Sequence, residues 1–169
     1  MTRPLVLVLA LLLGLAGGAR AEPEAPAAPP RVPSAAEALA AWQDFRADPL
    51  ARLDRTGPFL EFIRDSGAVH IVLNERLLAW MYQPMDPARK ATLYAAFLGG
   101  NMAEQLKNDK SSERDDVAGM ESALDAYAAL RKAHPDFSLA ALDALARARA
   151  EQRLAAAIAE LEHDDGPPP

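Results

Sequence analysis

Hydrophobic residues recur at helical spacing along most of this chain. Leu39, Trp42 and Phe45 follow one another three residues apart, which is the spacing of the buried side of an amphipathic helix. Just upstream, Ser34 and Glu37 have the spacing of a capping box, in which each side chain accepts a hydrogen bond from the backbone of the other residue. The pattern therefore predicts a first helix that begins after Ser34.

The same spacing predicts further helices, which are separated by proline, glycine or polar residues. Two short ones are expected, one between Pro49 and Gly57 and one over residues 58–66. Longer helices are expected from Pro87 onward and over residues 116–133. With the first and last helices, these elements predict an all-α, compact single domain of about five to seven helices, two of the early ones short.

The last helix is expected to be the longest. Phe137 and Ser138 mark its start, because a hydrophobic residue before the N-cap can pack against one in the first turn, here Leu142. We expect a continuous helix that reaches residue 163, with alanine and arginine on its polar side. Its predicted buried stripe consists of Leu142, Leu145, Leu154, Ile158 and Leu161.

Residues 68–82 fit two patterns. Val69, Ile71 and Leu73 alternate with their neighbours, as in a brief strand. Read at helical period, the segment instead presents one continuous apolar face over about four turns. Because no second strand is predicted that could pair with this one, we expect a helix here. The helical face would consist of Val69, Val72, Leu73, Leu77, Trp80 and Met81.

Gly99 and Gly100 are adjacent glycines within the helix predicted from Pro87. The apolar period runs through residues 93–106 without a change of phase, which favours a continuous helix. Each interior glycine costs about 1 kcal/mol relative to alanine, and close approach of a neighbouring helix along this row of small residues would offset that cost. The alternative is that the pair ends one helix and Asn101 begins another.

The two ends of the chain lie outside the predicted domain. Residues 1–21 have the layout of a signal peptide, namely a basic start, an apolar run and a small-residue cleavage site; an uncleaved membrane anchor is the alternative. Residues 22–33 hold five prolines and are expected to form a disordered leader. The helical domain is then residues 34–163, followed by a disordered tail, 164–169.

This layout predicts an exported protein. The alanine-, arginine- and proline-rich composition suggests a GC-rich bacterial genome, so the expected compartment is the periplasm, with secretion into the medium as the alternative. The chain has no cysteine, so its stability must come from a buried core rather than from disulfides. No membrane span is expected after cleavage of the signal peptide.

Charge excludes one class of partner. Lys and Arg total 18 and Asp and Glu 24, a formal net charge of −6. Residues 1–21 contain two arginines and no acid, so the exported part would carry −8. Because an acidic protein repels phosphate, no nucleic-acid partner is expected.

No local motif indicates catalysis, and the sequence assigns no catalytic residue. The three histidines lack the spacing of metal ligands, so neither a metal nor another cofactor is expected. Glu61 with Asp65, and Glu121 with Asp125, share helix faces and could act as acid–base pairs. Solvated helix faces are the simpler interpretation, and the sequence leans away from an enzyme.

One polar–aromatic group is the candidate surface for a ligand or partner. Asn101 and Gln105 lie four residues apart, on the same side of their helix as Tyr94. Amides beside aromatic rings can line a ligand cleft, or they can tie neighbouring loops by hydrogen bonds. The candidate residues are Trp80, Tyr94, Gly99, Gly100, Asn101 and Gln105.

A short stretch resembles a known family. Ala123, Tyr127, Pro135 and Asp136 are similar to the junction between tetratricopeptide repeats, which are helical hairpins that commonly bind peptides. The resemblance covers about fifteen residues, and no second copy follows at a period of about 34 residues. Leu130 also stands where that family prefers a small residue.

These observations predict an exported helical interaction or accessory module of the bacterial envelope that binds a protein or peptide. One alternative is a glycan or cell-wall hydrolase that uses dispersed carboxylates. The other is a domain that binds a small ligand around Asn101 and Gln105. The sequence does not indicate an oligomeric state.

Overall fold

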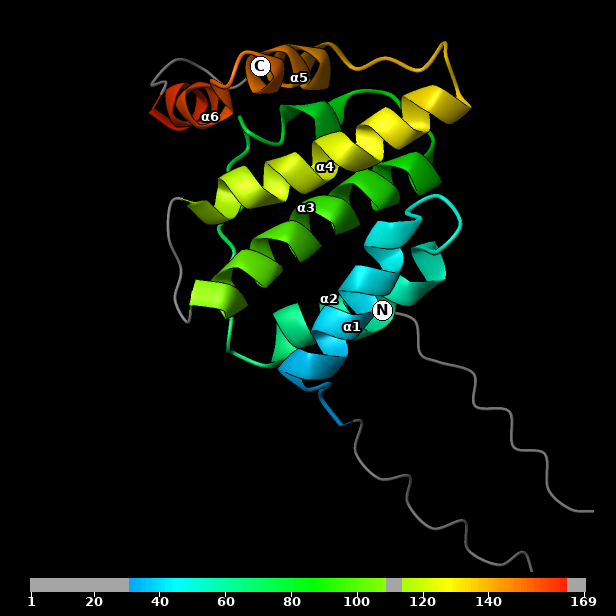
Figure 1. Cartoon of the computed structure of the whole chain (residues 1–169), viewed down its shortest axis with the longest axis vertical. Coiled ribbons are helices and arrows are strands. Elements are labelled where there is room, and N and C mark those ends of the chain that lie inside the picture. Colours follow the sequence, from blue (N-terminus) through cyan, green and yellow to red (C-terminus); the bar gives the residue numbers. More distant parts are fainter. Residues whose placement is uncertain (1–30, 109–113, 164–169) are drawn as a thin grey trace, which may run out of the picture. The chain divides into compact units, whose positions relative to one another are not determined.

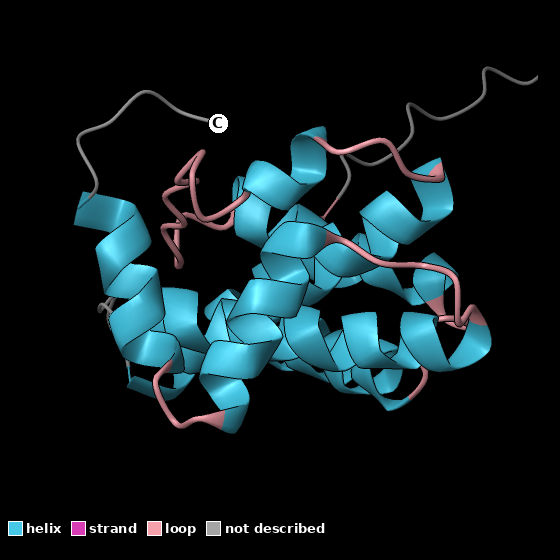
Figure 2. Cartoon of the chain, turned by 90° about the horizontal axis from the view of Figure 1, so that it is seen from above, coloured by secondary structure: helices cyan, strands magenta, loops and turns pink. Residues whose placement is uncertain are grey.

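The computed structural model describes residues 31–108 and 114–163. The predicted signal peptide, most of the leader and the tail lie outside these ranges. Figure 2 shows only helices and loops in the described part, which confirms the all-α prediction. Its elements are α1 (Ala35–Ala47), η1 (Leu53–Thr56), α2 (Gly57–Asp65), η2 (Ala79–Tyr82), α3 (Pro87–Asn108), α4 (Arg114–Ala133), α5 (Ala140–Ala150) and α6 (Leu154–His163), where η denotes a 3-10 helix (Figure 1).

The first helix begins as its sequence predicts. The Glu37 N–H donates to Ser34 Oγ at 3.3 Å, and the Ser34 N–H donates to Glu37 Oε2 at 2.7 Å. Trp42 and Phe45 are buried and meet Phe59 of α2, with ring centroids 5.7 and 5.9 Å from that of Phe59. The cap fixes where α1 starts, and these rings fix how α1 and α2 pack.

The two short early elements are contiguous rather than separate. Gly57 is the C-cap residue of η1, as expected, and with its right-handed helical angles it also begins α2 directly after η1. Pro58 follows in the first turn of α2, where a proline needs no intrahelical hydrogen bond. At the other end of α2, Gly67 has φ +66°, a left-handed conformation that ends the helix and that glycine adopts without strain.

Helices α3 and α4 lie side by side across the middle of the domain (Figure 1). The pair separates α1 and α2 on one side from α5 and α6 on the other. Every residue of α3 over the range 95–102 is buried, which leaves this stretch no solvent-facing side. The α3–α4 pair is therefore the centre of the core.

The glycines of this pair allow the helices to approach closely. The helix α3 runs without interruption through Gly99 and Gly100, as the apolar period predicts. A Cβ at Gly99 would overlap the indole ring of Trp42, and a Cβ at Gly100 would lie 2.6 Å from the Ala118 carbonyl oxygen of α4. From the opposite side, a Cβ at Gly119 would lie 2.8 Å from the Phe97 carbonyl oxygen. At these three positions there is room for the hydrogen atom of a glycine but not for a Cβ.

The helix expected over residues 68–82 is absent, and this prediction is wrong. Residues 69–74 are irregular, a turn follows, and only η2 is helical. The Gln105 side chain takes the place of a partner strand: its Oε1 accepts from the His70 N–H at 2.9 Å and its Nε2 donates to the His70 carbonyl at 2.8 Å. Val72 and Leu73, counted on the buried helical face, are exposed.

The single long C-terminal helix is also a wrong prediction, since it is broken into α5 and α6. Gln152 has φ +59°, and the N–H groups of Gln152 and Arg153 donate to the carbonyls of Arg149 and Ala148 at 3.0 and 2.8 Å. This is a Schellman motif, which ends a helix and reverses the chain. The cap before α5 is Leu139 rather than Ser138.

The apolar pattern contains the reason for this break. In a straight α-helix each residue is rotated by 100° about the helix axis. Leu154 and Ile158 would then point, on average, to a side about 170° away from the side of Leu142 and Leu145. A straight helix would therefore expose one of the two pairs. The turn at residues 151–153 lets both pairs face the core, and all four side chains are buried.

We predict that Gly99→Ala lowers the free energy of unfolding by about 1–3 kcal/mol, because the new methyl group overpacks against Trp42. Urea unfolding followed by tryptophan fluorescence measures this change. Gly57→Ala is the matched control, since nothing lies within 4 Å of its added Cβ and its backbone is already helical. That variant should be neutral or up to about 1 kcal/mol more stable. Equal unfolding midpoints for the two variants would contradict the prediction.

Candidate functional site

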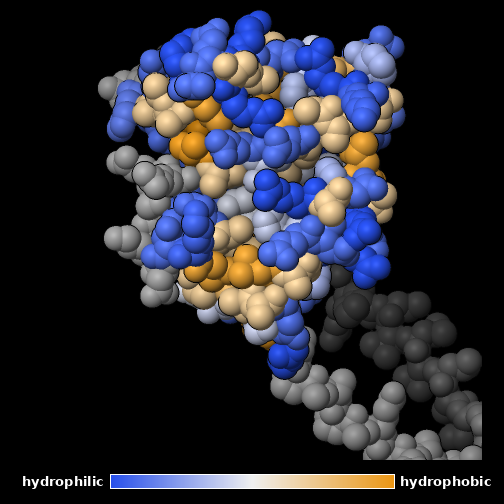
Figure 3. All heavy atoms as spheres, in the orientation of Figure 1, coloured by the Kyte–Doolittle hydropathy of each residue, from blue (hydrophilic) through white to orange (hydrophobic). Residues whose placement is uncertain are grey.

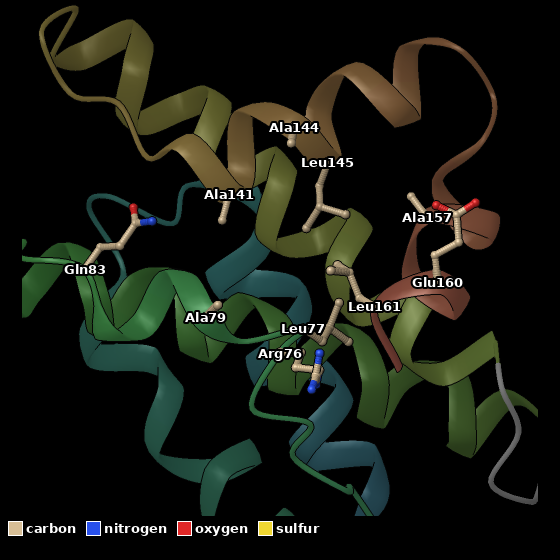
Figure 4. A pocket seen from close by; sticks show the side chains of 10 residues that line it. All are labelled: Arg76, Leu77, Ala79, Gln83, Ala141, Ala144, Leu145, Ala157, Glu160 and Leu161. Atoms are coloured by element: carbon tan, nitrogen blue, oxygen red, sulfur yellow. The ribbon is translucent and has the colours of Figure 1, made fainter. Parts of the chain in front are cut away.

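A cleft of about 640 Å³ lies between α5, α6 and the segment that leads through η2 (Figure 4). Three stretches of chain contribute to it, although they are distant in sequence. Most of the contributing side chains are alanine or leucine, and three are polar. The cleft is lined by Arg76, Leu77, Ala79, Gln83, Ala141, Ala144, Leu145, Ala157, Glu160 and Leu161.

The local structure explains why the cleft is open. The Schellman turn places α5 and α6 at an angle to each other, and the alanines on their facing sides are too short to fill the space. Leu77 and Leu145 are almost fully buried and supply an apolar floor. Arg76, Gln83 and Glu160 are polar, so the cleft can accept an apolar group and hydrogen-bond what is attached to it.

Sequence reasoning did not identify this cleft. None of its lining residues belongs to the predicted site, although Ala79 adjoins Trp80. One feature of the sequence could have indicated it: the apolar residues change to the opposite side of the helix between Leu145 and Leu154, which predicts a helical hairpin. The alanines at positions 141, 144 and 157 would then have marked a hollow between its arms.

The predicted site residues lie elsewhere, and most of them are buried. Trp80 is fully buried, and Gly99 and Gly100 are buried in the packing of α3. Tyr94 is half-buried, and this burial raises the pKa of its phenol. These four residues therefore form part of the interior, and none of them lines the cleft.

The two predicted amides, Asn101 and Gln105, join three segments by hydrogen bonds. Besides its two bonds to the His70 backbone, Gln105 donates from Nε2 to Asn101 Oδ1 at 2.8 Å. Asn101 in turn donates from Nδ2 to Asp116 Oδ1 of α4, also at 2.8 Å. Both amides are buried, so they connect the 68–74 segment to α3, and α3 to α4.

This network ends at a pair of carboxyl groups. Asp116 of α4 accepts the Asn101 hydrogen bond, and the preceding residue, Asp115, is buried. Burial raises the pKa of Asp116 to about 6, and the nearby Glu162 carboxyl adds to this shift. The Asn101 hydrogen bond acts in the opposite direction.

The carboxylates paired in the sequence at four-residue spacing are solvated instead. Asp65 binds Arg64 at 2.7 Å, and this hydrogen bond lowers the pKa of the Asp65 carboxyl. Asp125 binds Arg149 of α5 at 2.8 Å. Both carboxylates are exposed, which matches the simpler of the two interpretations.

Other classes of site find no support in the described part of the chain. No group of three or more histidine and acidic side chains there is arranged to hold a metal ion. Over the same residues, no helix has both the length and the apolarity that a membrane crossing needs.

Comparison with family models, with curated proteins and with solved structures finds no match for this chain.

We predict that Gln105→Met lowers the free energy of unfolding by about 2–4 kcal/mol, because the His70 N–H and carbonyl lose their partner. Hydrogen exchange at His70 should also accelerate. Gln43→Met on the exposed side of α1 is the matched control and should change stability by less than about 0.5 kcal/mol. Unchanged exchange at His70 in the Gln105 variant would contradict the assigned role of this amide.

Proposed function

We propose that this protein is an exported helical module that binds a protein or peptide segment in the cleft between α5, α6 and η2. The observation that carries this proposal is the composition of the cleft, which has an apolar floor and polar groups at its margin. A cleft of about 640 Å³ is large enough for a few side chains of a partner. Its polar groups can bind the partner's backbone.

The charge of the protein defines the partner further. The part after residue 21 carries −8, and a negative field attracts basic partners and repels acidic ones. On the face shown in Figure 3, hydrophilic residues are interspersed with apolar areas. We propose a neutral or basic peptide segment with two or three apolar side chains.

The alternatives have less support. A hydrolase needs a partly desolvated carboxyl group at a substrate cleft, whereas Glu160, the carboxylate at this cleft, is exposed. Asp116 is desolvated, but it does not line the cleft. A small-ligand site around Asn101 and Gln105 would need amides with free hydrogen-bonding groups, and these amides bind protein groups instead.

We predict that Ala144→Trp weakens peptide binding at least about 10-fold, because the indole fills the hollow between the arms of the hairpin. The probe is a synthetic peptide selected from a phage-displayed random library, and its affinity is measured by calorimetry. Ala144 is exposed, so the variant should keep its fold.

Ala156→Trp is the matched control, since Ala156 is exposed on α6 and does not line the cleft. This variant should bind the selected peptide as the unmodified protein does. Failure to select any peptide, or equal affinities for the two tryptophan variants, would refute binding in the cleft.

We also predict that a bacterial host exports the protein and cleaves it after Ala21, leaving Glu22 as the first residue. Ala19→Asp should block cleavage, because signal peptidase sites need small uncharged side chains there. Ala19→Gly is the control and should be processed. Mass spectrometry of the periplasmic fraction distinguishes these outcomes, and an unprocessed chain in the membrane fraction would instead favour the anchor.

A further inference from the structure

We propose that residues 69–74 form a strand-like edge that pairs, in antiparallel orientation, with the same segment of a second copy of this chain. The inference goes beyond the proposed function, because it concerns a surface that does not include the cleft between α5 and α6. It predicts a two-fold symmetric dimer, joined by backbone hydrogen bonds.

The hydrogen bonds of His70 give this segment the geometry of a strand. A single amide, that of Gln105, accepts from the His70 N–H at 2.9 Å and donates to the His70 carbonyl at 2.8 Å. Two residues paired across antiparallel strands exchange the same two bonds. Burial alternates as it does along a strand: Val69 is buried and Ile71 half-buried, whereas His70 and Val72 are exposed. Gln105 therefore occupies one edge of the segment.

The opposite edge has no partner within the described part of the chain. Backbone groups of successive strand residues point to alternate edges, so those of Ile71 and Leu73 point away from Gln105. Neither of these two N–H groups donates to any residue that the structure describes. Because buried N–H groups almost always have a partner, we infer that this edge faces solvent.

The sequence of the segment does not protect this edge. Natural edge strands are commonly kept from pairing by charged side chains or by proline. Residues 66–74 contain no Lys, Arg, Asp, Glu or Pro. Val72 and Leu73 are also 65% and 48% exposed. An uncharged segment rich in β-branched residues readily forms strand pairs.

A second copy fits the edge because the pairing is self-complementary. With Val72 on the two-fold axis, Ile71 of each copy lies opposite Leu73 of the other, and both pairs direct their backbone groups at the partner. Val72 then packs against its own copy. Glu75 is the nearest charged residue in the sequence, and it lies opposite Val69 in this register. Like charges therefore do not meet across the pair.

The assembly ends at a dimer. Since Gln105 occupies the other edge, a third copy has no strand edge to join. A single short strand pair buries less surface than a standard interface, so we expect a weak dimer with a Kd of about 10–100 µM.

Sedimentation equilibrium of the purified protein tests the dimer. We expect a monomer–dimer equilibrium, and Val72→Lys should raise its Kd at least about 10-fold, because two like charges would meet on the axis. The exposure of Val72 lets the variant keep its fold. Val32→Lys is the matched control, since Val32 is also exposed and lies outside the segment. This control should dimerise as the unmodified protein does.

A single introduced cysteine tests the position of the axis, because the chain has no cysteine of its own. Val72→Cys should form a disulfide-linked dimer under mild oxidation, since residues directly opposite in a non-hydrogen-bonded pair have Cα atoms about 4.5 Å apart, within the range of a disulfide. Val32→Cys is the control and should remain largely uncross-linked.

Several results would overturn the proposal. One is a protein that stays monomeric at about 500 µM, well above the expected Kd. Others are a dimer that Val72→Lys leaves intact and equal cross-linking of the two cysteine variants. Native mass spectrometry that finds a different chain on the protein, lost with Val72→Lys, in place of a second copy would overturn it as well.

The dimer and the proposed peptide site are tested independently. Val72→Lys should leave the affinity for the selected peptide unchanged, and Ala144→Trp should leave the dimer unchanged. Failure to select a peptide therefore does not affect the result for the dimer.

Discussion

The close approach of α3 to its neighbours is the constraint on which the rest of the structure depends. Gly99 admits the indole of Trp42, and Gly100 and Gly119 let the backbones of α3 and α4 approach each other. Glycine is unfavourable inside a helix by about 1 kcal/mol, so these positions are stable only because packing compensates. The compact pair that results supports α1 and α2 on one side and α5 and α6 on the other.

The sequence predicts those parts of the fold whose signals are local. The capping box at Ser34 and the unbroken apolar period through Gly99 and Gly100 are signals of this kind. Their outcome depends little on the remainder of the chain. The helical class and the starts of α1 and α3 follow from signals of this kind.

The two wrongly predicted helices have different causes. Residues 69–74 lack a partner strand, but Gln105, 35 residues further along from His70, supplies the hydrogen bonds of one. The break at Gln152 uses a left-handed residue that is not glycine, so no glycine or proline marks it. The change of the apolar side between Leu145 and Leu154 can be seen in the sequence, whereas the contact of Gln105 with His70 cannot. The cleft depends on the break at Gln152, so a prediction of one continuous helix could not include the cleft.

The cleft and the core depend on opposite uses of small side chains. In α3 and α4, small residues bring helices together because the neighbouring side chains fill the space above them. In α5 and α6, the alanines face a gap that no neighbouring side chain of the described domain fills, and the angle set by the Schellman turn keeps it open. Alanine reduces the side-chain entropy lost on folding but leaves apolar surface for a partner to cover. The proposed binding role of this hairpin makes use of that apolar surface.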